Sequence, residues 1–154
     1  MESENKASVS LVSDEEIPVC FEVFSKSFRH DAPFVDIHYP DYDTPWGQER
    51  GSKRLLAWKK GGEKSTLLEA TIAGSSSGGD DQIVGLALWT HMMEPPPVDI
   101  AEVENIEEAW PDRDDREFMT RLWRSYLISR SRAVENSGGK GVYGEPDRAP
   151  LNLL

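Results

Sequence analysis

The sequence predicts an α/β protein of the α+β kind, in which a mixed, mainly antiparallel sheet is flanked by helices. Its 154 residues fit one domain around one hydrophobic core. Residues 14–28 and 45–58 repeat apolar side chains at helical spacing after helix-start signals. Residues 66–73 and 83–92 resemble strands, and only the polar segment GSSSGGDD separates them, which favours an antiparallel pair.

The first predicted elements are a strand and a helix. In residues 8–12, Val9 and Leu11 alternate with polar serines, which is typical of a strand. Residues 13–16 (Ser-Asp-Glu-Glu) form a capping box, in which the serine and the last glutamate satisfy early helix N–H groups. We therefore expect a helix over residues 14–28 with one apolar face, formed by Ile17, Phe21, Phe24 and Phe28.

The next segment predicts a loop and a second helix. Residues 30–42 contain Pro33 and Pro40 and are expected to form an irregular loop. Thr44 is a helix cap with Pro45 at the first helical position, and this helix is expected to run to about Trp58 before two glycines.

The two middle strands differ in pattern. Residues 66–73 alternate, whereas residues 83–92 form a nearly continuous apolar run. Such a run predicts a strand that is covered on both faces. Three prolines at positions 95–97 end it.

A third helix begins at Asp112, and two glycines at 138–139 end it. Its apolar side is formed by Met119, Leu122, Trp123, Tyr126, Leu127, Ala133 and Val134. Val142 and Tyr143 predict a further strand, but the segment GEPDRAP that follows disfavours a strand ladder. We divide the chain into a flexible tail (1–7), a folded unit (8–143) and a divergent C-terminal segment (144–154).

Charge and composition exclude several classes of partner and site. The chain has 17 basic and 28 acidic residues, a net charge of −11, which repels nucleic acid and anionic membranes. It begins without a secretory signal and has no apolar run of ~20 residues, so we expect a cytoplasmic protein. One cysteine, Cys20, excludes an internal disulfide and a cysteine-based zinc site, and its apolar neighbours predict a buried core residue.

Complete catalytic motifs for phosphate binding, zinc proteolysis or serine hydrolysis are missing from the sequence. The glycine-rich residues 138–141 follow a helix instead of opening one, so they offer no helix N-terminus to an anion. His38 lies near Asp36, Asp41 and Asp43, which suggests either a metal site or a solvated acidic loop. We favour the loop and predict no metal.

The end of the apolar strand supplies the candidate substrate-binding residues, which are Trp89, His91 and Glu94. His91 beside Trp89 would place a polar group over an aromatic surface and line a pocket. Alternatively, His91 faces water at the strand end. Glu94 could act as a base, although the following prolines place it in a turn.

Several segments together resemble fungal N-acetyltransferases of the GNAT (GCN5-related) type. Residues 43–47 (DTPWG) and 54–59 (RLLAWK) resemble the start and end of the second helix of that family, and residues 82–89 (QIVGLALW) are similar to its third strand. Trp110-Pro111, residues 115–118 (DREF) and the helix over 122–132 resemble the extra helical insertion of the fungal subgroup. The likeness covers residues 8–143.

The resemblance implies a partial GNAT-like fold and acetyl-CoA-dependent N-acyl transfer to an amine or other small molecule. In the family, a fourth strand pairs with the third, and a basic glycine loop after it holds the pyrophosphate of acetyl-CoA at a helix N-terminus. Residues 151–154 (LNLL) resemble the start of that strand, so we expect a chain truncated before the cofactor loop and weak or inactive by itself. No catalytic or cofactor-binding residue can be carried over, and the acceptor is expected near residues 30–43 and 89–94.

The sequence also leaves other interpretations open. The chain could be a non-catalytic binding or regulatory protein that pairs with itself, as a homodimer through the open edge of the third strand. It could also be an incomplete product without a function of its own, or a small acidic domain that binds an unrelated ligand.

Overall fold

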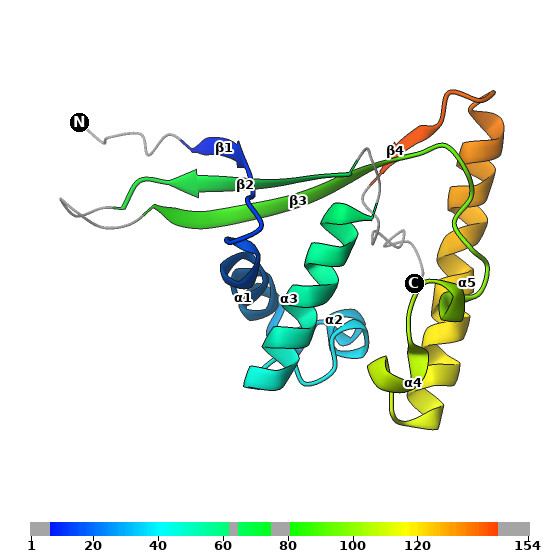
Figure 1. The fold of residues 1–154 in the computed structure, drawn as a ribbon, viewed down its shortest axis with the longest axis horizontal. Helices are drawn as coiled ribbons and strands as arrows, with labels where there is room; N and C mark the ends of the chain where they lie inside the picture. Colours follow the sequence, from blue (N-terminus) through cyan, green and yellow to red (C-terminus); the bar gives the residue numbers. More distant parts are fainter. Residues whose placement is uncertain (1–6, 62–64, 75–80, 145–154) are drawn as a thin grey trace.

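The computed structural model describes residues 7–61, 65–74 and 81–144, and it confirms the α+β class (Figure 1). One antiparallel sheet has the strand order β1-β2-β3-β4. Its strands are β1 (Ser8–Leu11), β2 (Ser65–Ile72), β3 (Gln82–Met92) and β4 (Val142–Gly144). The predicted tail, most of the GSSSGGDD turn and residues 145–154 lie outside the described residues.

The strand pairing follows the sequence prediction. β2 and β3 are antiparallel, with Leu67 opposite Leu88, and the register shifts between Ala70 and Thr71. β1 pairs with the other edge of β2, and Val142 and Tyr143 do form a strand, which pairs with the end of β3. The sheet order therefore equals the chain order.

Among the described residues, helices cover one face of the sheet. Val12, Ile17, Cys20, Leu67 and Leu88 form a core between α1 (Ile17–Phe28) and the strands, with side chains of α3 (Pro45–Lys60) packed against it. Figure 1 shows α1, α2 (Pro33–His38) and α3 on the same side of the long strands.

The opposite face of the sheet is apolar and open. Alternation along the strands and their register place these residues on it: Val9, Leu11, Leu68, Ala87, Trp89, His91 and Tyr143. Val9, Leu11 and Tyr143 are 68%, 69% and 71% exposed, and Trp89 is 45% exposed. We call this set the open face. The prediction that residues 83–92 are covered on both faces is therefore wrong, because the apolar run combines one buried face with one that no described element covers.

α1 starts later than predicted. The Glu16 carboxylate accepts a hydrogen bond from the Ser13 backbone N–H at 2.7 Å, which is one half of the capping box, but residues 14–16 form a turn and the helix begins at Ile17. The helix buries Ile17, Cys20, Phe21 and Ser25 on one side.

The loop predicted over residues 30–42 contains helical turns. A 3₁₀ turn, η1 (Arg29–Asp31), leads into the short helix α2. Pro33 occupies the start of α2, where a missing N–H has no cost, so the proline that suggested a loop begins a helix instead.

α3 packs closely on its neighbours at two glycines. Thr44 caps it as predicted, since its Oγ1 accepts from the Gly47 N–H at 3.0 Å. A Cβ at Gly47 would lie 1.8 Å from the Asp41 carbonyl oxygen, and one at Gly51 would lie 1.9 Å from Cζ of Phe21. Both positions therefore require glycine.

The segment between β3 and β4 forms a helical module. It contains η2 (Ile100–Glu102), α4 (Ile106–Ala109) and the long α5 (Arg113–Asn136), which Asp112 caps. Its core includes Ile100, Ala109, Met119 and the fully buried Trp110, whose Nε1 donates to the Ile37 carbonyl at 2.6 Å. The module is thereby anchored to α2.

The glycine-rich residues 138–141 terminate α5, as predicted. Gly138, Gly139 and Gly141 adopt positive φ angles of 63°, 80° and 72°, and β4 follows them directly. Within the described part of the chain, no helix has the length and apolar character that crossing a membrane requires.

Candidate functional site

The three sequence-predicted site residues lie at the end of β3 but not in one pocket. Trp89 and His91 share the open face, whereas Glu94 is exposed in the bend after the strand. His91 stacks on Tyr143 with ring centroids 4.4 Å apart, and its Nε2 donates to the Lys140 carbonyl at 3.0 Å. The neighbouring Thr90 and Met92 point the other way and line a cleft.

That cleft, of about 680 Å³, lies between α3, the paired ends of β2 and β3, and the helical module. We call it the acceptor-side cleft, because the resemblance leads us to expect the acceptor near its lining residues. It brings together His38, Tyr39 and Pro40 from the first half of the chain with Thr90 and Met92 from the end of β3. Further lining residues include Trp58, Glu104, Asn105, Glu108 and Trp123. The two segments singled out in the sequence therefore meet in this cleft, although through different side chains.

Arg54 joins the walls of the acceptor-side cleft. Its guanidinium donates to the His38 carbonyl and forms an ion pair with Glu104 of the module. It also lies 4.9 Å from the ring centroid of Trp110 and 5.5 Å from that of Trp58. The side chain is only 12% exposed, so this pair is largely screened from water.

A second arginine holds the same wall one helical turn earlier. Arg50 donates from Nη2 to the Ala109 carbonyl at 2.9 Å, and its guanidinium lies 4.2 Å from the Trp46 ring centroid. Arg50, Arg54 and Trp58 recur every four residues along α3. This spacing was visible in the sequence, but the charged residues were not assigned to the buried side.

Burial shifts the pKa values of two groups in the acceptor-side cleft, Glu104 and His38, toward their neutral forms. Burial raises the pKa of Glu104, and the charge of Arg54 opposes that shift. Burial lowers the pKa of His38 to about 4, so its imidazole is neutral at pH 7. The His38 ring donates from Nδ1 to the Phe34 carbonyl at 2.9 Å, and its centroid lies 4.0 Å from that of the Phe34 ring, with the two planes tilted by 33°. His38 is therefore a packing residue, and the favoured interpretation of a solvated acidic loop is wrong for it.

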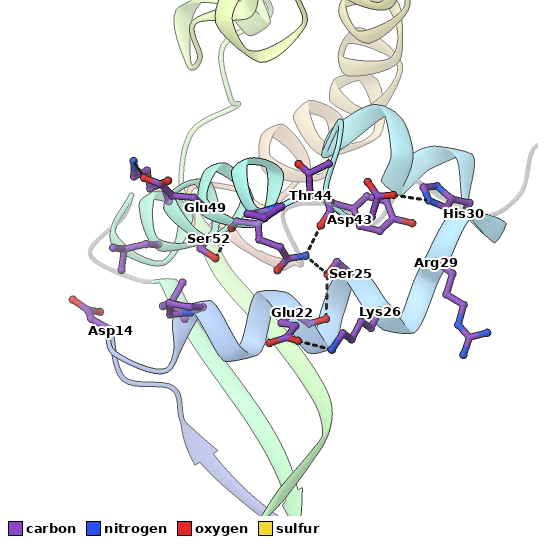
Figure 2. Close-up of a pocket in the computed structure, with 17 residues that line it drawn as sticks. Asp14, Glu22, Ser25, Lys26, Arg29, His30, Asp43, Thr44, Glu49 and Ser52 are labelled. Atoms are coloured by element: carbon purple, nitrogen blue, oxygen red, sulfur yellow. Dashed lines mark hydrogen bonds and ion pairs between the residues drawn. The ribbon is translucent and has the colours of Figure 1, made fainter.

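A shallower groove of about 1140 Å³ runs between α1 and α3 (Figure 2). Gln48 of α3 bridges the two helices, since its Nε2 donates to Ser25 Oγ at 2.8 Å and to the Tyr42 carbonyl. Exposed ion pairs, Lys26 with Glu22 and Lys53 with Glu49, line the rim. These polar groups are already paired, so the groove offers few free partners to a ligand.

His30 closes one end of this groove between two carboxylates. Its Nδ1 lies 3.0 Å from Asp36 and its Nε2 lies 3.6 Å from Asp43. The hydrogen bond to Asp36 is the largest cause that raises the pKa of His30. Two carboxylates stabilise the protonated ring, so His30 is suited to hold the loop by charge and less suited to act as a base.

Cys20 is a buried core thiol, as the sequence predicts. It is fully buried, and burial together with the charge of Glu69 raises its pKa to about 11. Its Sγ lies 3.8 Å from the Glu69 carboxylate, which also accepts from Ser10 Oγ. The thiol is therefore protonated at neutral pH and is not a nucleophile.

Groups of three or more His, Cys, Asp or Glu side chains that could hold a metal ion are not found in residues 7–61, 65–74 and 81–144. Searches against protein families, curated proteins and solved structures give no match to this chain.

Proposed function

We propose that this chain carries the acceptor side of an acetyl-CoA-dependent N-acyltransferase of the GNAT type, and that it transfers acetyl groups only slowly by itself. The observation that carries this proposal is the acceptor-side cleft. It is lined by residues 38–40 and by the end of β3, which are the regions where the resemblance leads us to expect the acceptor.

The order of the elements also supports the proposal. The resemblance leads us to expect a second helix with a DTP start, an IVG-type third strand, a helical insertion and a fourth strand that pairs with the third. α3 starts at Pro45 after the Thr44 cap, and β3 carries the IVG sequence and is followed by the helical module. Residues 151–154, which resemble the start of the fourth strand, lie outside the described residues.

The acceptor-side cleft contains two carboxylates that could hold an amine, among the basic side chains of Arg50, Lys53, Arg54 and Arg130. Primary amines are cations at neutral pH, and Glu104 and Glu108 both line the cleft. Glu104 is already paired with Arg54, whereas Glu108 is exposed to solvent. Trp58 and Trp123 offer apolar surface for the rest of the acceptor. The reaction would take place in the cytoplasm, as the sequence predicts.

An acetyl-transfer assay with a panel of primary amines at millimolar acetyl-CoA tests this function. We expect slow product formation above the rate without protein, and a higher KM for the amine in Glu108→Gln. The matched control is Glu107→Gln, which removes the same charge from the neighbouring residue outside the cleft lining. The absence of product with every amine would contradict the enzyme assignment.

The second function that we propose is non-catalytic self-pairing. It is favoured by the long edge of β3 that lacks a strand partner among the described residues, where β4 pairs only with residues 90–92. A protein of this kind would associate with its own copies and give no acetylated product in the assay above.

A further inference from the structure

We propose that the outward side of α5 is a docking surface for an acidic segment of a partner protein. Five exposed residues form this surface, which are Phe118, Arg121, Arg124, Ile128 and Arg132. We call them the arginine face. The proposal is independent of acetyl transfer and is tested without acetyl-CoA.

The arginine face lies opposite the side by which α5 packs on the rest of the molecule. α5 buries Met119, Tyr126, Leu127 and Val134. With about 100° of rotation per residue, these four residues and the arginine face fall on opposite sides of the helix axis. Figure 1 shows α5 at the outer margin of the molecule, with the other helices on one side of it. The arginine face is therefore accessible to a partner.

The charge of the arginine face is opposite to that of the whole molecule. The chain has a net charge of −11, yet residues 118–134 contain four arginines and no aspartate or glutamate. Within residues 7–61, 65–74 and 81–144, the guanidinium groups of Arg121, Arg124 and Arg132 have neither an ion pair nor a hydrogen bond. Three cations on the exposed side of this helix thus lack a described counter-charge.

This pattern differs from that of a helix face that only meets water. Such a face is usually stabilised by opposite charges four residues apart, whereas Arg121 and Arg124 place like charges three residues apart, which destabilises a helix. Glu117, four residues before Arg121, is paired with Arg113 at 2.9 Å. Arginine and aromatic residues are enriched at protein interfaces, and Phe118 is 47% exposed beside these charges.

Charge complementarity selects the partner. The arginines attract carboxylates, and Ile128, which is 57% exposed between Arg124 and Arg132, offers contact to an apolar side chain. The matching partner is a segment in which Asp or Glu alternates with apolar residues.

Nucleic acid and anionic membranes fit this surface less well. Both are extended polyanions, so they would also meet the rest of the molecule, which is strongly acidic. A short segment covers the arginine face alone. At physiological salt, charges beyond ~8 Å are largely screened, so the acidic remainder opposes such a segment only weakly.

Fluorescence anisotropy of labelled peptides tests the proposal. The probe is a short peptide built on the repeat Glu-Glu-Leu-Phe, and the comparison peptide has lysine in place of glutamate. We expect saturable binding of the acidic peptide only, and Arg124→Glu should weaken it at least ~10-fold. Lys26→Glu is the matched control, because it reverses the same charge at an exposed residue of α1 and should leave the affinity unchanged.

Ile128→Ser separates docking from general attraction between charges. It removes apolar surface without changing the charge, and it should also weaken the acidic peptide. Circular dichroism verifies that each variant folds, as expected for exposed positions. The proposal would be overturned by an acidic peptide that does not bind, by equal effects of Arg124→Glu and Lys26→Glu, or by an Ile128→Ser variant with unchanged affinity. Tighter binding of duplex DNA or phosphatidylserine vesicles at the same ionic strength would also overturn it.

Discussion

Gly51 sets how closely α3 approaches α1. It lies in the middle of a sixteen-residue helix, where alanine is normally favoured by ~1 kcal/mol. Its ideal Cβ would lie 1.9 Å from the ring of Phe21, which is fully buried. Replacing Gly51 with alanine would therefore stabilise the helix through its propensity and destabilise the packing against Phe21 through a steric clash.

We expect the steric term to dominate, so that Gly51→Ala lowers the free energy of unfolding by ~1–3 kcal/mol. Urea unfolding followed by circular dichroism measures the change. Gly85→Ala is the control, because its Cβ would meet Ala70 at an ordinary 3.6 Å. A neutral or stabilising effect of Gly51→Ala would show that α1 and α3 are not packed as described.

His38 makes stability depend on pH. Its pKa falls from an ordinary 6.5 to about 4 because burial disfavours the charged ring. As the pH drops below 6.5, the unfolded chain binds the proton first, so the native state loses up to ~3 kcal/mol between pH 6.5 and pH 4. Unfolding titrations across this range should show that loss, and His38→Gln should reduce it.

His30 provides a control, because its pKa is shifted in the opposite direction to that of His38. Its pKa is raised by Asp36 and Asp43, so its contribution to stability is complete below the unfolded pKa and is lost as the pH rises through the folded one. His30→Gln should therefore not remove the loss of stability on acidification. If His38→Gln leaves the dependence of stability on pH unchanged, this would contradict the description of His38 as buried and neutral.

At the scale of elements, Arg54 connects α3 to the helical module. It contacts the His38 carbonyl in α2, Glu104 after η2 and the Trp110 ring after α4. Removal of one partner from a largely buried ion pair leaves the other without compensation. The Arg54–Glu104 pair is therefore expected to contribute strongly to the docking of the module.

Arg54→Met should destabilise the protein by about 3 kcal/mol, and the double variant Arg54→Met with Glu104→Met should recover a large part of that loss. Urea unfolding of both single variants and the double variant gives the coupling energy. Strictly additive effects would show that the Arg54 and Glu104 charges do not interact.

Local signals in the sequence predicted most of the elements. Thr44 and Pro45 located the start of α3, and the alternation in residues 66–73 located β2, because caps and periodicity act over a few residues. They missed α2, since Pro33 signals both a loop and a helix start. They also misjudged β3, because an apolar run does not reveal whether a second layer covers it.

The candidate site was less predictable than the fold. The sequence identified the end of β3 as a candidate site. Side chains alternate between the two faces of the strand, so Thr90 and Met92 enter the acceptor-side cleft while Trp89 and His91 lie on the open face. Which of these residues face the helices depends on the register with β2 and on its shift near Ala70, and only the assembled sheet fixes that register. Arg54 and Glu104 are fifty residues apart, so no local pattern indicated that pair.

At the scale of the whole molecule, both proposed functions depend on a sheet that the described helices cover on one face. α1 and α3 form one layer over the sheet, the helical module stands at the β4 end, and no described element covers the open face or the edge of β3 at residues 82–89 (Figure 1). The acceptor-side cleft lies between the helical layer and the module, on the other side from the open face. Acetyl transfer and self-association would thus use different surfaces.

We propose that the described residues supply the acceptor side of an acetyltransferase and that they hold no pyrophosphate cradle for acetyl-CoA, because the glycine-rich residues 138–141 follow α5 instead of opening a helix. Calorimetric titration of the chain with acetyl-CoA tests it most directly. We predict a dissociation constant in the millimolar range, because an anion held without a cradle of backbone N–H groups gains little binding energy. Micromolar binding would contradict the claim and would place a cofactor site within this chain.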